Sequence, residues 1–216
     1  MLFRSQWLGQ RLSMLVEPYL AFYHYDYSLF TVIKRQPFPV REGHDFEMDV
    51  RRLSTYGKDR ATRMWAKVEE DPEYAKLAQR IWADGFIPIE ERDEEWLKES
   101  LENRNKQIER AVAATKKLQE KGVEVIFVRN PAEGHYAISK PMYNPRAETW
   151  DVLIEKTGAI GIHYMDHEEL QGYWLPEWSH MSGSEADRYT KALVHVIERE
   201  RSKRENSSQE QAKGSR

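Results

Sequence analysis

Two short apolar runs separated by a helical segment constrain the fold of this chain more than any other feature. Residues 123–128 and residues 159–163 are rich in β-branched side chains, as strands buried in a parallel sheet are. Residues 146–157, between the two runs, have apolar side chains at helical spacing and are followed by Gly158, a typical helix end. A strand, a helix and a strand in this order predict two parallel strands joined by a right-handed crossover.

Two further helices are predicted beside this unit. Residues 93–121 carry one apolar stripe, have lysines in the last turn and stop at Gly122. Residues 184–199 begin with Ser184-Glu-Ala-Asp187, which fits the start of a helix. The alternation of helices and strands predicts an α/β fold of three layers. Because two strands are too few for an independent sheet, we expect either added strands from the N-terminal region or an incomplete sheet.

The N-terminal half has mostly helical patterns. We predict helices over residues 10–22, 60–70 and 71–85. The aromatic residues of 22–33 fit either a packed aromatic wall or a surface on which a ligand stacks. These patterns divide the chain into a mostly helical region (1–122), an α/β region (123–200) and a disordered tail (201–216).

Composition excludes several classes of function. The net charge of −3 predicts no nucleic-acid partner. The chain has no cysteine, so disulfides, thiol catalysis and cysteine-ligated zinc are excluded. No apolar run approaches the roughly 20 residues that a membrane helix needs, and the first residues form no export signal, so localisation is left open.

The candidate catalytic residues lie in a proline-led segment just before the last predicted helix. Glu177 precedes His180 by three positions. A carboxylate so placed can accept a hydrogen bond from one imidazole nitrogen and leave the other nitrogen free to take a proton from a nucleophile. The spacing alone favours an ordinary surface histidine, whereas the position after the last strand and just before the last helix favours the catalytic interpretation, so both stay open.

Polar residues also follow the two predicted strands, where functional groups of α/β sheets gather. Arg129 and Asn130 follow the first strand and are candidate substrate-binding residues. Arg129 would either neutralise an anionic substrate or form a salt bridge with Asp166. A metal site would draw on a histidine-rich set near the second strand, but a strand end does not point such ligands at one ion, and we expect no metal and no cofactor. That set is His163, Asp166 and His167, with His135 or His180.

The C-terminal half resembles the end of an SGNH (GDSL-type) hydrolase. The resemblance covers roughly residues 123–199. Its matching segments are Val125-Ile-Phe-Val-Arg129-Asn-Pro131, Thr149-Trp150-Asp151, Gly161-Ile-His163, Asp166-His167-x-x-Leu170 and Leu175-Pro-Glu-Trp-Ser-His-Met-Ser182, with the helix through Leu193. In that family the last block reads Asp-x-x-His and supplies the acid and the base of a catalytic triad.

The resemblance implies a flavodoxin-like sandwich in which His180 is the general base and Glu177 orients it. The substrate would be a small-molecule or polymer-linked ester, and the N-terminal helices would be an insertion of the kind seen in such bacterial proteins. Glutamate stands here where the family has aspartate. The Gly-x-Ser turn that carries the family's nucleophile is not found in this sequence.

We therefore expect a chain that begins inside the family's domain, after its first strand and serine, and that is inactive as an esterase without them. The missing strand would bare a sheet edge, so we also expect self-association. The alternative is a non-catalytic α/β binding or scaffold protein.

Overall fold

The computed structural model describes residues 2–16, 19–20, 29, 33, 50, 52–56 and 61–214. The chain divides into two compact units, Met1–Ile81 and Trp82–Arg216. The aromatic segment 22–33, apart from residues 29 and 33, lies outside the described residues, so the choice between wall and stacking surface stays a prediction. The sequence patterns place a boundary between the helical and the α/β region after residue 122. In the structure, the long helix before residue 122 belongs to the same compact unit as the parallel strands.

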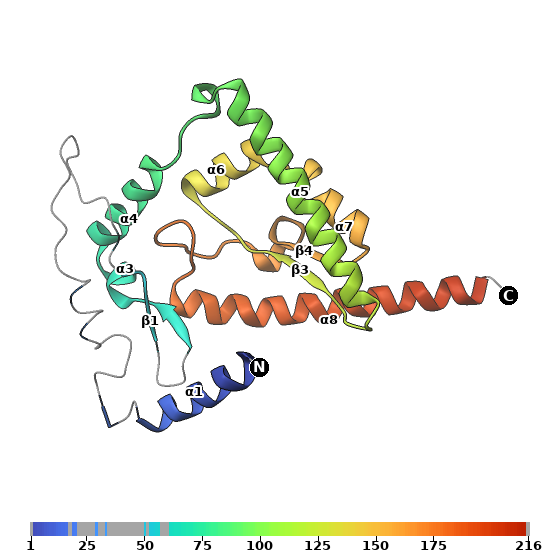
Figure 1. The fold of residues 1–216 in the computed structure, drawn as a ribbon, viewed down its shortest axis with the longest axis horizontal. Helices are drawn as coiled ribbons and strands as arrows, with labels where there is room; N and C mark the ends of the chain where they lie inside the picture. The colour runs from blue at the N-terminus through green and yellow to red at the C-terminus, as the bar shows by residue number, and fades with distance from the viewer. Residues whose placement is uncertain are drawn as a thin grey trace. The chain divides into compact units, whose positions relative to one another are not determined.

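The first unit contains helices and a short antiparallel ribbon (Figure 1). Its elements are α1 (Leu2–Val16), β1 (Ser54–Tyr56), β2 (Thr62–Met64), α3 (Ala66–Glu70) and most of α4 (Pro72–Asp84). The helix predicted over residues 60–70 is therefore wrong in its first half, where residues 62–64 pair with β1. The start of α4 is as predicted, because the Asp71 carboxylate accepts hydrogen bonds from the backbone N–H groups of Glu73 and Tyr74.

The second unit is mixed α/β and mostly helical. Its long helices are α5 (Glu94–Gln119) and α8 (Gly183–Gly214), and its shorter elements are the end of α4, η3 (Ile89–Glu91), β3 (Ile126–Arg129), α6 (Gly134–Tyr143), η4 (Arg146–Glu148), α7 (Trp150–Thr157), β4 (Ile160–His163), η5 (Tyr164–Asp166) and η6 (Glu168–Leu170). The sequence did not predict α6, which begins at Gly134 without a side-chain cap and contains Pro141. No described helix is both long and apolar enough to cross a membrane.

The strands β3 and β4 form a two-stranded parallel sheet, as the two apolar runs predicted. Ile126 pairs with Ile160, and Arg129 pairs with His163 at the carboxyl end. Each strand keeps one edge without a partner strand among the described residues. The structure shows this small sheet and not a complete sandwich.

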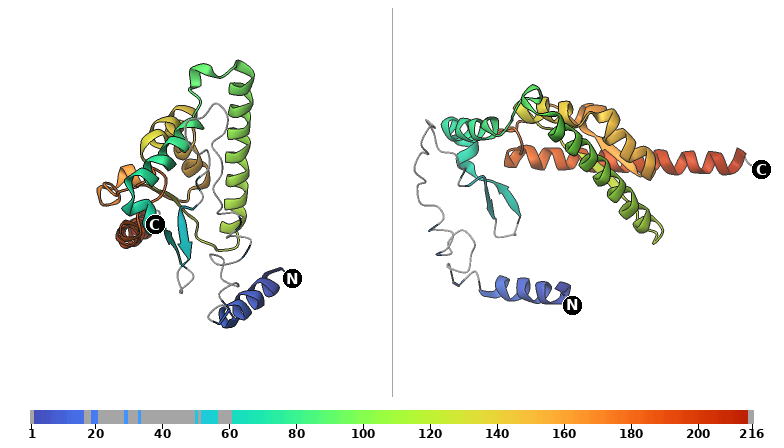
Figure 2. Two further views of the ribbon diagram at one scale, coloured as in Figure 1. Left: turned by 90° about the vertical axis from the view of Figure 1, so that its left-hand side faces the viewer. Right: turned by 45° about the horizontal axis from the view of Figure 1, so that its top comes forward.

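Helices cover both faces of this sheet. Ile160 and Ile162 are buried in a cluster with Tyr189 and Val196 of α8. Gly161, between the two isoleucines, faces α7, where a Cβ atom would lie 2.6 Å from Cδ1 of Ile154. The helix α5 lies beside α7 in turn (Figures 1 and 2).

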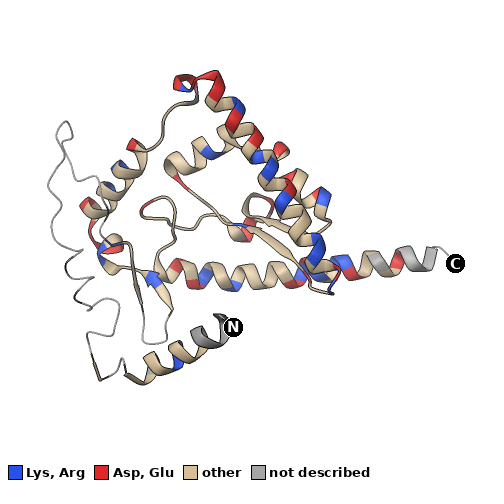
Figure 3. Ribbon diagram, in the orientation of Figure 1, with Lys and Arg blue, Asp and Glu red and all other residues tan. Residues whose placement is uncertain are grey.

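The helix α8 starts earlier and ends later than the sequence predicted. Ser182, and not Ser184, caps it, because its hydroxyl accepts the backbone N–H of Glu185 at 3.3 Å. Residues 201–214 continue the helix, although their lack of apolar side chains predicted disorder. Lysine, arginine, glutamate and glutamine are good helix formers, and charges of both signs follow each other along this part of α8 (Figure 3).

Candidate active site

The loop between η6 and α8 brings Glu177 and His180 into direct contact, as their spacing predicted. The imidazole Nδ1 lies 2.8 Å from Glu177 Oε1, and the backbone N–H of His180 donates to the same oxygen at 2.6 Å. The Glu177 side chain is fully buried, whereas 67% of the His180 side chain is exposed. A buried acid thus holds an imidazole that faces solvent.

Two residues that the sequence analysis did not single out complete the carboxylate's environment. Trp82 Nε1 donates to Glu177 Oε2 at 2.8 Å, and the Ser179 hydroxyl donates to the same oxygen at 2.7 Å. Ser179 Oγ also lies 2.9 Å from His180 Nδ1. The carboxylate therefore accepts four hydrogen bonds, two on each oxygen, which is the full complement that a buried carboxylate needs.

The hydrogen bonds set the charge state of the pair. Burial alone would raise the pKa of Glu177, but the hydrogen bonds from His180, Ser179 and Trp82 outweigh it and hold that pKa below its ordinary value. The hydrogen bond to Glu177 raises the pKa of His180 against the opposing effect of burial. An ionised Glu177 can only accept, so Nδ1 must donate, and the neutral imidazole then carries its lone pair on Nε2.

His180 Nε2 makes no hydrogen bond within the part of the chain that the structure describes. Ser179 contacts Nδ1, the nitrogen that faces the carboxylate. A nucleophile must instead give its proton to the other nitrogen, so Ser179 orients the pair and is not the nucleophile. The open nitrogen is the one through which a base would act.

A strained turn holds the loop in place. Trp178 has φ = 73°, a left-handed conformation that is unfavourable for a bulky residue. Its carbonyl accepts the backbone N–H of Glu133 at 2.9 Å, and its ring packs against Gly134, where a Cβ atom would lie 2.3 Å away. Since Glu133 follows β3 by four residues, the loop is fixed against the segment that leaves the carboxyl end of the sheet.

The two candidate substrate-binding residues have different surroundings. Arg129 lines a cavity of about 630 Å³ together with His163, which lies opposite it on β4. Asn130 does not line this cavity, and its Oδ1 accepts the hydroxyl hydrogen of Tyr189 at 3.0 Å.

Of the two interpretations of Arg129, the salt bridge with Asp166 does not form. Asp166 instead receives two hydrogen bonds of 2.7 Å from Arg146, whose Nε also donates to Asp151 at 3.1 Å. The planar guanidinium of Arg146 matches both oxygens of Asp166, and Arg146 begins the short helix η4 that leads into α7.

The histidines near β4 do not gather into a metal site in the described residues. His163 Nδ1 accepts the backbone N–H of Met165, and its ring stacks on Tyr164. His167 instead contacts Arg199 on α8. The two histidines therefore have separate partners.

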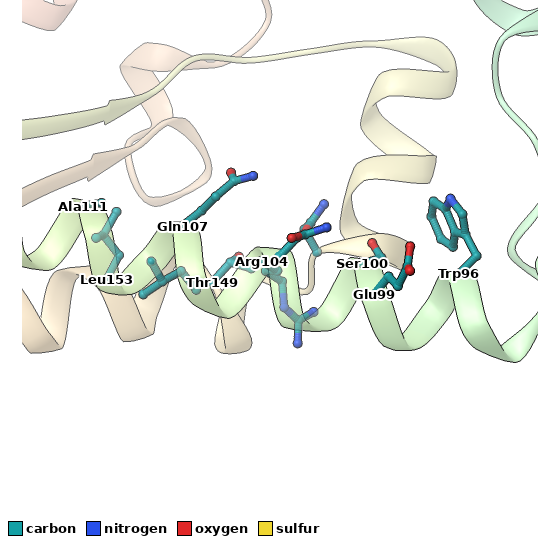
Figure 4. Close-up of a pocket in the computed structure, with 11 residues that line it drawn as sticks. Trp96, Glu99, Ser100, Arg104, Gln107, Ala111, Thr149 and Leu153 are labelled. Carbon is teal, nitrogen blue, oxygen red and sulfur yellow. The ribbon is translucent and has the colours of Figure 1, made fainter.

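A second hollow, of about 660 Å³, lies along α5 and carries no acid–imidazole pair (Figure 4). Arg104 lines it, but its guanidinium is bound to Glu148 at 2.6 Å and to the carbonyl of Tyr143. Arg104 thus connects α5 to the segment before α7.

Comparisons of the chain with protein-family models, with curated proteins and with solved structures find no match.

Proposed function

We propose that Glu177 and His180 are the acid and base of an SGNH-type hydrolase site that acts on esters or acyl groups. One observation carries this proposal: a fully buried carboxylate accepts the hydrogen of Nδ1 while Nε2 stays open. In such a site His180 takes the proton of the attacking hydroxyl and returns it to the leaving alcohol, and the Glu177 carboxylate stabilises the imidazolium between the two steps.

The same proposal extends to the fold. The parallel pair β3 and β4, with α8 on one face and α7 on the other, is a pattern that a flavodoxin-like SGNH sandwich would contain. Glutamate in place of aspartate is compatible with the chemistry, because the glutamate reaches Nδ1 at 2.8 Å.

Hydrolysis of p-nitrophenyl acetate tests the proposal. No described hydroxyl bonds to Nε2, and removing the nucleophile of another serine hydrolase costs about 10⁶-fold in kcat, so we expect a slow rate. His180→Ala should abolish this slow hydrolysis. The matched control is His195→Ala on α8, whose side chain is 79% exposed and lies 3.8 Å from the exposed Glu198, and it should keep the rate.

A non-catalytic binding protein is the second candidate. The observation that favours it is the lack of any described hydroxyl at the base nitrogen. Equal rates for the unmodified protein, His180→Ala and His195→Ala would remove His180 from any mechanism and support this second candidate.

Self-association through the sheet is part of the proposal. Each strand has an edge without a partner strand in the described chain, and Val128 of β3 is partly exposed. We expect a concentration-dependent dimer by light scattering and its loss on Val128→Lys, because a charge at a strand edge opposes pairing. A monomer at all concentrations would contradict this.

A further inference from the structure

The cavity at the carboxyl end of β3 and β4 combines positive charge with aromatic rings. Its lining residues come from α5, β3, α6, the start of α7 with the segment before it, and the end of β4 with the residues that follow. Its volume of about 630 Å³ suits a small molecule. None of its lining residues is an aspartate or a glutamate. Its charged and aromatic lining residues are Arg129, Tyr136, Lys140, Arg146, Trp150, His163 and Tyr164.

Two of the three cations that line the cavity are not neutralised. Arg146 is bound by two carboxylates, but neither Arg129 nor Lys140 forms an ion pair with any residue of the described chain. Partial desolvation and the nearby charge of Arg129 lower the pKa of Lys140, so the two cations interact unfavourably. A bound anion would relieve this repulsion.

Most of the remaining lining is apolar or aromatic, and Asn144 and Thr149 add polar groups. The Lys140 ammonium lies 4.9 Å from the centre of the Tyr136 ring. Trp150 meets the His163 ring edge-on at a centroid distance of 5.3 Å, and Tyr164 stacks on the same ring at 5.2 Å. Burial and the charge of Arg146 lower the pKa of His163, so this histidine adds no positive charge at pH 7.

We propose that this cavity binds a phosphate monoester whose phosphate group lies between Arg129 and Lys140 and whose apolar part lies against the aromatic side chains. A phosphate monoester carries a charge of about −1.5 to −2 at pH 7, which matches two unpaired cations better than a single carboxylate does. The guanidinium of Arg129 can bind two phosphate oxygens at once, while the Lys140 ammonium supplies a point charge. The inference goes beyond the proposed hydrolase activity, because binding needs neither His180 nor a nucleophile.

Isothermal titration of the full chain with phenyl phosphate tests the inference. Charge-assisted hydrogen bonds predict that Arg129→Gln and Lys140→Gln each weaken binding by about 10-fold or more. Lys140 is exposed, so its substitution leaves the fold intact even if that of Arg129 does not. The control Lys191→Gln, an exposed lysine of α8, should bind phenyl phosphate like the unmodified protein.

Three comparison ligands separate the parts of the site. We expect all three to bind more weakly than phenyl phosphate. Inorganic phosphate lacks the aromatic ring, benzoate lacks the second negative charge, and benzyl alcohol has no negative charge. Benzoate binding as tightly as phenyl phosphate would overturn the assignment to phosphate. Lack of phenyl phosphate binding, or equal binding by Lys140→Gln, would overturn the site itself.

His180→Ala separates this inference from the proposed hydrolase. That variant should bind phenyl phosphate unchanged, whatever its effect on ester hydrolysis. A loss of binding in His180→Ala would contradict an independent anion site.

Discussion

Replacing Glu177 by glutamine removes one charge and one acceptor from a site where four donors converge. Each carboxylate oxygen accepts one hydrogen bond from a backbone or indole N–H, which can only donate. It accepts a second one from a hydroxyl or an imidazole, which could also act as an acceptor. Oε1 faces the backbone N–H and Nδ1 of His180, and Oε2 faces the indole N–H of Trp82 and the hydroxyl of Ser179. The hydroxyl can rotate and the imidazole can change tautomer, but the backbone and indole N–H groups cannot become acceptors.

The cost of Glu177→Gln follows from this geometry. Whichever way the amide turns, its NH₂ group faces one fixed N–H, which is left buried without an acceptor at a cost of about 1–3 kcal/mol. The three surviving hydrogen bonds lose the ionised acceptor, and bonds to a charged group are roughly twice as strong as neutral ones. Together, one unsatisfied buried donor and three weakened hydrogen bonds should lower the free energy of unfolding by about 3–5 kcal/mol.

Urea unfolding followed by far-ultraviolet circular dichroism at pH 7 measures this loss. A double-mutant cycle with Trp82→Phe sharpens the test, because removing the indole N–H removes the buried donor that would otherwise oppose the amide NH₂ at the Oε2 position. We expect the double variant to be at least about 1 kcal/mol more stable than the sum of the single losses implies. A loss below about 1 kcal/mol for Glu177→Gln, or strict additivity, would refute the four-donor description of the site.

Two further predictions concern the turn and the pH dependence of the pair. Gly134→Ala should lower the free energy of unfolding by about 2–4 kcal/mol, because φ is +51° there and the added Cβ meets the Trp178 ring. The control is Gly85→Ala, whose Cβ makes only an ordinary contact, and it should change the free energy of unfolding by under about 0.5 kcal/mol. Equal losses in the two variants would refute the close contact at Gly134. The pKa of His180 is raised in the folded protein, so the stability that its protonation adds should be fully present below about pH 6.5 and should be lost as the pH rises through the folded pKa. The pKa of Glu177 is lowered, so the stability that its ionisation adds should be lost as the pH falls through the folded pKa of Glu177. Unfolding of the protein and of His180→Ala across pH 3–9 checks both signs, and a stability difference that grows above neutral pH contradicts them.

Local patterns were sufficient to predict the parallel strands and the helices that flank them. The β-branched runs gave β3 and β4 to within a few residues, and Asp93 and Gly122 bracket α5. Periodicity, caps and stop residues act over a few positions, so they can be recognised without knowledge of the tertiary structure.

Elements that depend on distant contacts could not be predicted. The helix α6 has no capping side chain and contains Pro141, and the residue just before it, Glu133, donates its backbone N–H to the carbonyl of Trp178. The strand β2 is too short to show an alternating pattern, and its pairing with β1 determines its conformation. In both cases the stabilising partner lies elsewhere in the chain.

The candidate site divides in the same way. The Glu177 and His180 contact spans three positions and was predicted from spacing. Ser179, between them, could have been found from the same segment, since a hydroxyl next to a buried carboxylate is a natural donor. Trp82 lies 95 positions before Glu177, and nothing in the local sequence indicates that its indole reaches the carboxylate. Arg146 likewise took the place expected for Arg129 as the partner of Asp166.

The tautomer of His180 is the most direct test of the proposed acid–base pair. Nitrogen-15 NMR of the imidazole, recorded above its pKa and assigned with His180→Ala, distinguishes a hydrogen on Nδ1 from one on Nε2. We expect the hydrogen on Nδ1, where the Glu177 carboxylate accepts it at 2.8 Å, and an unprotonated Nε2 ready to act as a base. A hydrogen on Nε2 would contradict the orientation of the imidazole by Glu177.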